Sequence, residues 1–166
     1  AKTLVDYGHK KLVVLASENK INDAYERVAG VKKGLKEAGV GLESEAVFYA
    51  EPSLIGGKKA INAALSNGLS FTAVIAYNDN MAVGAMNELL DQGYQVPHDI
   101  SVIGFDDLFF ASTCRPALTT FFHPIEGMGE YATHLSLALP RLDISTELKT
   151  RAFKPSLVMR DSVSKI

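Results

Sequence analysis

Short apolar runs alternate with amphipathic stretches along the first two thirds of the chain. Four runs are rich in aliphatic and β-branched residues, as expected of strands that are buried on both faces of a sheet. They span residues 12–16, 45–50, 72–77 and 100–105. Between them, apolar residues recur at intervals of three and four, which is typical of helices with one buried face. These helices are expected at residues 23–39, 53–67 and 79–92, the last beginning at Asp79 or Asn80.

The spacing of the four predicted strands indicates how they are connected. Their first residues recur about every 30 positions, which is close to the length of one βαβ unit. Connections of this kind are right-handed and join parallel strands, so helices come to lie on both faces of the sheet. The sequence therefore predicts the α/β class, with a doubly wound parallel sheet.

The alternation ends after the fourth strand, and the later segments follow another plan. An irregular stretch contains the adjacent Phe109 and Phe110, which are expected to be exposed. An extended segment, a single amphipathic helix and a final strand are predicted at residues 118–122, 125–139 and 155–160. At the other end, residues 1–8 are typical of the last turns of a helix that stops at Gly8. We therefore expect the sequence to be a fragment of a longer protein.

Composition and charge limit the classes of function. The 166 residues include 17 Lys and Arg against 19 Asp and Glu, a formal net charge of −2. This balance lacks the basic surface of a nucleic-acid-binding protein. The single cysteine, Cys114, excludes an intramolecular disulfide and is interpreted as a small apolar filler. No apolar run approaches the ~20 residues of a membrane span.

Polar side chains gather at the carboxyl ends of the predicted strands, where open α/β sheets bind their ligands. In chain order these are Ser17, Asn19, Asp23, Arg27, Glu51, Asn78, Asp79, Asp106 and Asp107. Carboxylates accept hydroxyl protons, a guanidinium donates a planar fork, and a carboxamide does both. This set favours a neutral polyhydroxyl ligand, and the loops lack the clustered glycines of a phosphate site. For Asn78 and Asp106 taken singly, a purely structural role is equally open.

Three of the other strand-end positions also have structural alternatives. Asp79 or Asn80 would cap the third helix by accepting a backbone N–H. Asp107 would cap a short turn in the same way. Arg27 would be a solvated charge on a helix surface.

Motifs of enzymes and metal sites are missing from the sequence. The run GGKK at residues 56–59 lacks the GxxxxGK[ST] pattern of a phosphate loop, and GxGxxG, GxSxG, HExxH and CxxC do not occur. The histidines are scattered: His9 and His98 are interpreted as loop residues, and His123 would lie near the mouth of a cleft. A Mg²⁺ site at the acidic strand ends is an alternative, but no Lys or Thr completes a phosphoryl-transfer site. We expect no enzyme activity, no cofactor and no metal.

Longer motifs point to a family. Residues 72–108 read TAVIAYNDNMAVGAMNELLDQGYQVPHDISVIGFDDL, and residues 115–132 read RPALTTFFHPIEGMGEYA. Together with GHKKLVVLA, RVAGVKKGLKEAG and PSLVMRDSV, they resemble the effector-binding domain of the LacI/GalR family of bacterial transcriptional repressors. The resemblance covers essentially the whole chain, and the residues of these motifs are most similar to those of the galactose-repressor branch. It implies a type I periplasmic-binding-protein-like fold of two lobes.

The resemblance also implies which residues touch the ligand. The family's sugar-binding arginine, asparagine and aspartate fall on Arg27, Asn78 and Asp106, and Asp23 is a further candidate one helical turn before Arg27. Family members often place an aromatic ring beside the loop that here reads AEPSL, so in this chain the stacking partner is missing or lies elsewhere. The ligand would be a monosaccharide or disaccharide.

By the same resemblance, the chain is divided among parts of a two-lobed domain. Residues 1–8 would be the end of a helix from an absent N-terminal lobe, and residues 9–120 would form the C-terminal lobe. Residues 121–150 would be a crossover and a helix that belong to the N-terminal lobe, and residues 151–166 would be a return strand and tail. The helix at 125–139 would then lack its partner, and would pack on a neighbouring copy or leave an apolar patch exposed. A homodimer interface would include Val83 in the helix 80–92 and the stretch 108–114, unless its two phenylalanines fold back onto their own core.

The predicted function is the effector-sensing and dimerisation portion of a cytoplasmic, sugar-responsive repressor. Operator DNA would be bound only through a headpiece that lies outside this sequence, and no membrane contact is expected. One alternative is a periplasmic sugar-binding protein of a transport system. A second is an enzyme or signalling domain of flavodoxin-like fold that uses Asp106 and Asp107.

Overall fold

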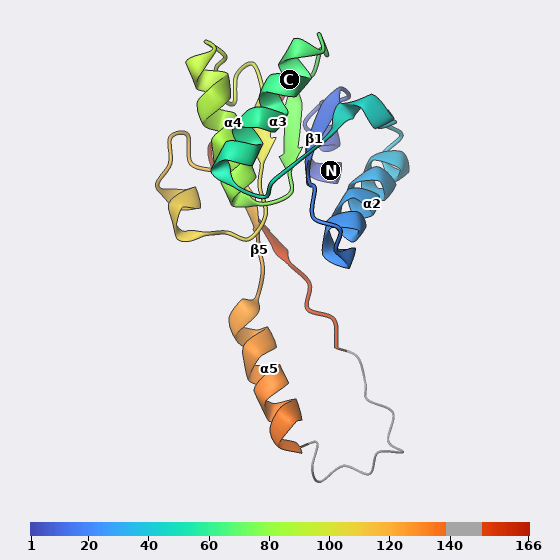
Figure 1. The fold of residues 1–166 in the computed structure, drawn as a ribbon, viewed down its shortest axis with the longest axis vertical. Coiled ribbons are helices and arrows are strands. Elements are labelled where there is room, and N and C mark those ends of the chain that lie inside the picture. The colour runs from blue at the N-terminus through green and yellow to red at the C-terminus, as the bar shows by residue number, and fades with distance from the viewer. Residues whose placement is uncertain (139–150) are drawn as a thin grey trace.

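The computed structural model describes residues 1–138 and 151–166. Its centre is a four-stranded parallel sheet in the order β2-β1-β3-β4 (Figure 1). The strands are β1 (Leu12–Ser17), β2 (Val47–Ala50), β3 (Ala73–Ala76) and β4 (Ser101–Ile103). The helices around them are α1 (Lys2–Asp6), α2 (Asn22–Glu37), α3 (Leu54–Ser66) and α4 (Asp79–Asp91). The prediction of a doubly wound parallel sheet is confirmed.

Successive residues of a strand point to opposite faces of the sheet. Because the apolar strands place hydrophobic side chains on both faces, helices cover both of them. Val13 and Leu15 of β1 face a core shared with α3 and α4. Leu12 and Val14 of the same strand face a second core, which α1 and α2 cover. All six residues of β1 are buried, as expected of a central strand between two helical layers.

Helices α3 and α4 approach each other closely, and glycines make this possible. A Cβ atom on Gly57 of α3 would lie 2.1 Å from the carbonyl oxygen of Met81 in α4. In return, a Cβ on Gly84 of α4 would lie 2.0 Å from the carbonyl oxygen of Leu54 in α3. Real side chains do not tolerate such distances, so each helix presents a bare backbone to the other at this crossing.

Helix α1 packs against this sheet through Leu4. Residues 1–8 were expected to belong to a separate lobe, but Leu4 is fully buried in the core that Leu12, Val14 and Leu35 form. The helix is only five residues long, and Ala1, Val5 and Tyr7 pack against the same core beside Leu4. A second difference is that β2 begins at Val47, because Ser44–Ala46 form a 3₁₀ turn.

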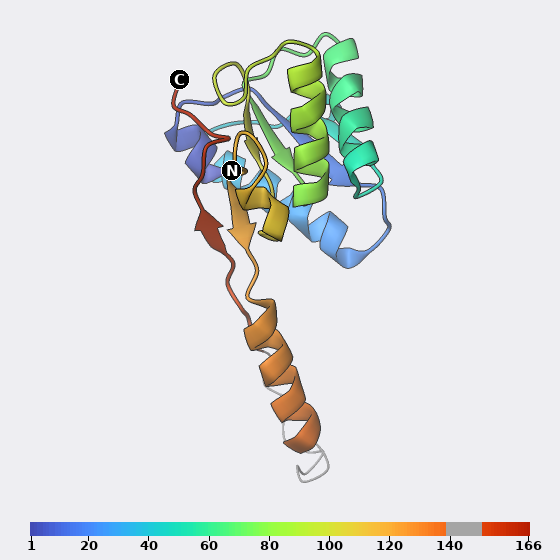
Figure 2. The same cartoon turned by 90° about the vertical axis from the view of Figure 1, so that its left-hand side faces the viewer.

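Beyond β4 the chain leaves the sheet through two antiparallel strands, β5 (Thr120–Phe122) and β6 (Ser156–Val158). They connect the sheet to α5 (Ile125–Ala138), which extends away from the rest of the molecule (Figures 1 and 2). None of the residues of α5 is buried, and Ile125 and Leu137 are 64% and 70% exposed. Among the described residues, the ring of Phe153 packs edge-on against that of Tyr131 in this helix, with ring centres 5.9 Å apart, and much of the remaining apolar stripe is exposed. The predictions for residues 121–150 and for a helix to 139 extend over residues 139–150, which lie outside the described residues.

The last residues return to the sheet. The amide N–H of Val102 donates to the carbonyl oxygen of Ser162, and the Ser162 hydroxyl donates to the carbonyl oxygen of Val102. His9, which is fully buried, bonds to the Thr72 hydroxyl and to the carbonyl oxygen of Ser164. The segment 162–166 thus fastens β4, the approach to β3 and the end of α1 to one another.

Candidate functional site

Arg27 is the centre of a polar cluster at the carboxyl end of the sheet. It lies on the second turn of α2, and its side chain points toward the ends of β3 and β4. Its Nε donates to Asp23 at 3.0 Å, and Nη1 donates to the carbonyl oxygen of Tyr77 at 2.6 Å. A carboxylate oxygen of Asp106 lies 3.7 Å from Nη1. The structure therefore brings three of the predicted site residues, Asp23, Arg27 and Asp106, into one group.

Two aromatic rings enclose the guanidinium group of Arg27. Its Cζ lies 4.4 Å from the ring centre of Tyr77 and 4.1 Å from that of Phe105. The Tyr77 hydroxyl also donates to Asp23 at 2.6 Å. Cation–π contacts and hydrogen bonds together fix the orientation of the guanidinium plane. Arg27 is thus preorganised, not a freely solvated helix charge.

The two carboxylates of the cluster are held in different electrostatic states. Burial pushes the pKa of Asp23 upward, but the hydrogen bonds from Tyr77 and Arg27 outweigh it, so this pKa lies below its usual value. For Asp106 burial is dominant and its pKa is raised, with the charges of Arg27 and His123 offsetting only part of the effect. Burial and the bond to Asp23 raise the pKa of Tyr77 to about 12. Asp106 is therefore the carboxylate that gains most from new hydrogen-bond donors.

The backbone at Asp106 and Asp107 is unusual. Their backbone φ angles are 111° and 53°, in the positive range that residues other than glycine rarely adopt. Asp106 is held there by its amide N–H, which donates to the carbonyl oxygen of Phe121 in β5. Asp107 forms an ion pair of 2.6 Å with Arg160, and both side chains are largely buried. Strain of this kind is common at functional sites.

Three of the other strand-end residues have structural partners. Asn78 is nine-tenths buried and caps α4: Oδ1 accepts the amide N–H of Met81, and Nδ2 donates to the carbonyl oxygen of Pro52. Neither Asp79 nor Asn80 is the cap, contrary to that alternative. Asp79 is fully buried and accepts hydrogen bonds from the Thr120 hydroxyl and the Leu108 amide. The role of Asn78 in ligand binding therefore remains a prediction from the resemblance, and Asp107 belongs to an ion pair.

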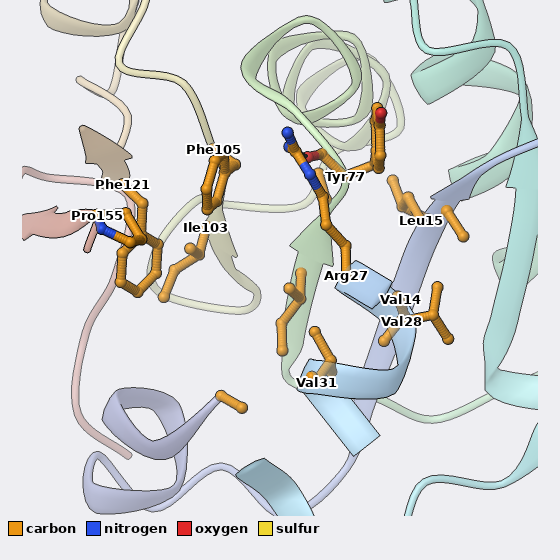
Figure 3. A pocket seen from close by; sticks show the side chains of 16 residues that line it. Val14, Leu15, Arg27, Val28, Val31, Tyr77, Ile103, Phe105, Phe121 and Pro155 are labelled. Atoms are coloured by element: carbon orange, nitrogen blue, oxygen red, sulfur yellow. Dashed lines mark hydrogen bonds between the residues drawn. The ribbon is translucent and has the colours of Figure 1, made fainter. Parts of the chain in front are cut away.

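An apolar pocket lies beside this cluster on the face of the sheet that α2 covers (Figure 3). Its volume is about 240 Å³. Val14, Ile103 and Phe121 are among its lining residues, and Arg27 is the one charged side chain among the described residues that line it. A polyhydroxyl ligand would find few hydrogen-bond partners inside it. The candidate site is therefore the polar cluster around the guanidinium group of Arg27.

The ring residues at the site, Tyr77 and Phe105, were not among the predicted site residues. Tyr77 immediately precedes Asn78, and Phe105 immediately precedes Asp106. An aromatic side chain at the last position of a predicted strand is therefore the sequence feature that could have identified them. Glu51 lies apart, at a separate pocket that Tyr49 and Lys59 also line. Tyr49 is 58% exposed and is the aromatic side chain nearest in sequence to the AEPSL loop.

Comparison with known proteins decides the family. The family model described as a periplasmic binding protein-like domain matches residues 1–163. The chain belongs to this family. Its parallel sheet with helices on both faces is the fold of a periplasmic binding protein-like domain. Among the described residues, no helix has the length and apolar character needed to cross a bilayer.

The relatives of this periplasmic binding protein-like domain are transcription regulators. The HTH-type transcriptional regulator GalR of Escherichia coli is 42% identical over 161 residues, which cover 97% of this chain and 47% of that protein. The crystal structure of the E. coli transcriptional repressor ascG is 31% identical with a TM-score of 0.86, covering 98% of this chain and 59% of that one. A complex of the regulator CelR with cellobiose is 28% identical with a TM-score of 0.88, covering 97% and 49%.

The resemblance to LacI/GalR regulators is therefore confirmed. The chain spans about half the length of the curated relatives that it matches.

Proposed function

We propose that the chain is the effector-sensing and dimerisation portion of a sugar-responsive transcriptional repressor. The observation that carries this proposal is the preorganised cluster of Arg27, Asp23 and Asp106 in a domain whose relatives are regulators. The guanidinium of Arg27 donates to ligand hydroxyls and Asp106 accepts from them, as two neighbouring groups of a saccharide require. Asn78 fixes the start of α4 beside this cluster.

No bond is made or broken in this function. The effector changes operator affinity only as far as it binds one conformation of the repressor better than the other, and coupling of about 1–3 kcal/mol is typical. The operator is bound by a headpiece outside this sequence, and the protein acts in the cytoplasm. A complex of a relative with cellobiose supports a small saccharide as the class of effector.

The proposed dimer uses the surface around Phe109. This side chain is 86% exposed, and its ring contacts that of Phe110 edge-on at 5.4 Å. Both belong to a 3₁₀ turn that follows the strained Asp106 and Asp107. A large apolar ring exposed to this extent favours an interface. Because only Asp107 and Leu108 separate the turn from Asp106, an effector bound there is well placed to influence the dimer.

Calorimetric titration tests the proposal. The gene product that contains these residues is titrated with D-galactose, D-glucose, D-ribose, cellobiose and adenosine. We expect saturable binding of at least one saccharide, and the Asp106→Ala variant should weaken it by at least tenfold because the ligand loses a charged acceptor. Asp6→Ala, which removes an exposed carboxylate on α1, is the matched control and should bind normally.

Two results would contradict the proposal. Absence of binding for all five compounds would exclude a simple sugar effector. Equal binding by the Asp106→Ala variant would place the site elsewhere.

A further inference from the structure

The turn that carries Asp106 is held at both ends by a single residue of α4. This residue, Asp79, is fully buried and is the first residue of the helix. Its amide N–H donates to the carbonyl oxygen of Phe105 at 2.9 Å, and its Oδ2 accepts the amide N–H of Leu108 at 2.8 Å. Only Asp106 and Asp107 lie between those two residues. Asp79 therefore spans the turn and fixes the chain on either side of Asp106.

The same carboxylate also holds the strand to which Asp106 is bonded. Oδ1 of Asp79 accepts a hydrogen bond from the hydroxyl group of Thr120, which is fully buried in β5. The next residue of this strand, Phe121, accepts the amide N–H of Asp106 at its carbonyl oxygen, at 2.9 Å. Both carboxylate oxygens of Asp79 are thus used, one for the turn and one for β5. Asp106 belongs to the first and is hydrogen-bonded to the second.

The backbone of the turn depends on such support. Asp106 and Asp107 have φ angles of 111° and 53°. Conformations of this kind persist only where the surrounding structure over-determines them. Without the Asp79 carboxylate the turn would lose its hydrogen bond at Leu108 and β5 would lose the one at Thr120. The backbone would then relax toward commoner φ values, which turns the Asp106 side chain away from its present direction.

The neighbourhood of Asp79 is shaped for its carboxylate, although burial there is unfavourable. A Cβ atom on Gly104 would lie 2.2 Å from Oδ1 of Asp79, so only glycine at this position leaves room for the bond to Thr120. Burial raises the pKa of Asp79, and the hydrogen bonds from Thr120 and Leu108 offset this in part. Capping does not explain the residue, because Asn78 is the cap of α4. What the carboxylate does hold is the turn and β5.

We propose that Asp79 is a positioning residue of the effector site, which acts through Asp106 and does not touch the ligand. This inference rests on the proposed function and adds a residue whose side chain lies outside the polar cluster. Hydrogen bonds weaken steeply when their distance or angle departs from the optimum. Removal of Asp79 should therefore reduce affinity for the saccharide even though every group that contacts the ligand is still present.

The test compares dissociation constants from calorimetric titration of the gene product with the five compounds named above. Asp79→Ala removes both side-chain hydrogen bonds. Asp79→Asn keeps them, because its carbonyl oxygen accepts the Leu108 amide and its amino group donates to the Thr120 hydroxyl oxygen. His9→Ala is the matched control: it also removes two hydrogen bonds of a fully buried side chain, but near the amino ends of β1 and β3. A double variant combines Asp79→Ala with Asp106→Ala.

We expect Asp79→Ala to bind the effector about tenfold more weakly, and Asp79→Asn to recover most of that loss. Thermal denaturation of each variant separates affinity from stability. Asp79→Ala and His9→Ala should both lose stability, but His9→Ala should keep the wild-type dissociation constant. In the double variant, Asp79→Ala should add no further loss to that of Asp106→Ala, because the residue through which it acts is already truncated.

The outcomes distinguish this inference from the proposed function. Wild-type affinity of Asp79→Ala, or losses that multiply in the double variant, would overturn the inference while the proposed function stands. If Asp79→Ala does not fold, Thr120→Val carries the same comparison, since it removes only the hydroxyl bonded to Oδ1. A loss of about threefold is then expected, and unchanged affinity would contradict the inference. If the wild type binds none of the five compounds, the proposed function itself is wrong, and the role of Asp79 with it.

Discussion

At the scale of single residues, Arg27 shows how the proposed site is ordered in the absence of a ligand. Asp23, the Tyr77 carbonyl and two aromatic rings hold the guanidinium in place. Long side chains lose rotamer entropy when they bind, and a residue already ordered by its neighbours has less to lose. The rigid aromatic support around Arg27 should therefore favour affinity even though none of it needs to touch the sugar.

His9 provides a pH-dependent contribution to stability. Burial lowers the pKa of His9 below its usual value of about 6.5, and the bond to the Ser164 carbonyl oxygen offsets this only in part. The unfolded chain then binds more protons than the folded one as the pH falls through this range. We expect the free energy of unfolding to fall as the pH drops below about 6.5, down to the pKa of the folded state.

Urea denaturation at a series of pH values measures this effect. In His9→Gln the difference from the wild type should shrink toward acid pH, because the variant has no histidine to protonate there. His98→Gln, at an exposed site, should keep the wild-type slope. If the wild type and His9→Gln lose stability in parallel between pH 7 and 5, the explanation is wrong.

The sequence predicted the types of polar residue at the strand ends but not which of their atoms are free. Asn78 and Asp107 have suitable chemistry, yet one caps α4 and the other pairs with Arg160. These partners depend on how helices and crossover strands meet in three dimensions. Tyr77 and Phe105 were missed because an aromatic residue at the end of a buried strand is normally taken as part of the core.

At the scale of elements, α3 and α4 cross with their backbones in close contact. Gly57→Ala would force a methyl group against the Met81 carbonyl oxygen, and the helices would have to move apart. We expect a decrease of about 1–3 kcal/mol in the free energy of unfolding, typical of overpacked cores. Gly30→Ala is the control, because nothing lies within 4 Å of its added Cβ on α2.

The control should stabilise the protein by about 0.5–1 kcal/mol, since alanine is the better helix former. Urea or thermal denaturation of the two variants and the wild type gives the comparison. An unchanged or increased stability of Gly57→Ala would show that the two helices can separate without cost.

The elements themselves were predicted well where their hydrophobic period is strong. The strands and the helices of the sheet domain lie within a few residues of the expected ranges. The predictions fail where the hydrophobic periodicity does not show which neighbouring element a segment packs against. Residues 44–46 have polar and apolar neighbours that suit a strand or a turn, and the few residues of α1 could not reveal which core Leu4 joins.

At the scale of the whole molecule, two apolar surfaces are open for association. One is centred on Phe109, and the other is α5 with Ile125 and Leu137. We expect Phe109→Glu to convert a dimer into a monomer, because a carboxylate would be buried without a partner at the interface. Leu137→Glu should leave the dimer intact and reduce further association at high concentration. Sedimentation equilibrium of both variants separates the two effects.

A dimer that survives Phe109→Glu would contradict an interface at Phe109, and a dimer that dissociates with Leu137→Glu would assign the interface to α5. Far-ultraviolet circular dichroism of both variants serves as the check that each remains folded.

The return of residues 162–166 to the sheet has a consequence for the order in which the protein is made. These residues come after every helix and strand, yet they supply neighbours to β4 and to His9. While the chain emerges from the ribosome, the Val102 amide on the edge of β4 lacks its partner and the pocket for Val163 stays open until this segment follows. Long-range closure of this kind slows folding and leaves an interval in which nascent chains are prone to aggregate. A stalled nascent chain that ends before Val158 should therefore be digested by protease much faster than one in which residue 166 has cleared the exit tunnel.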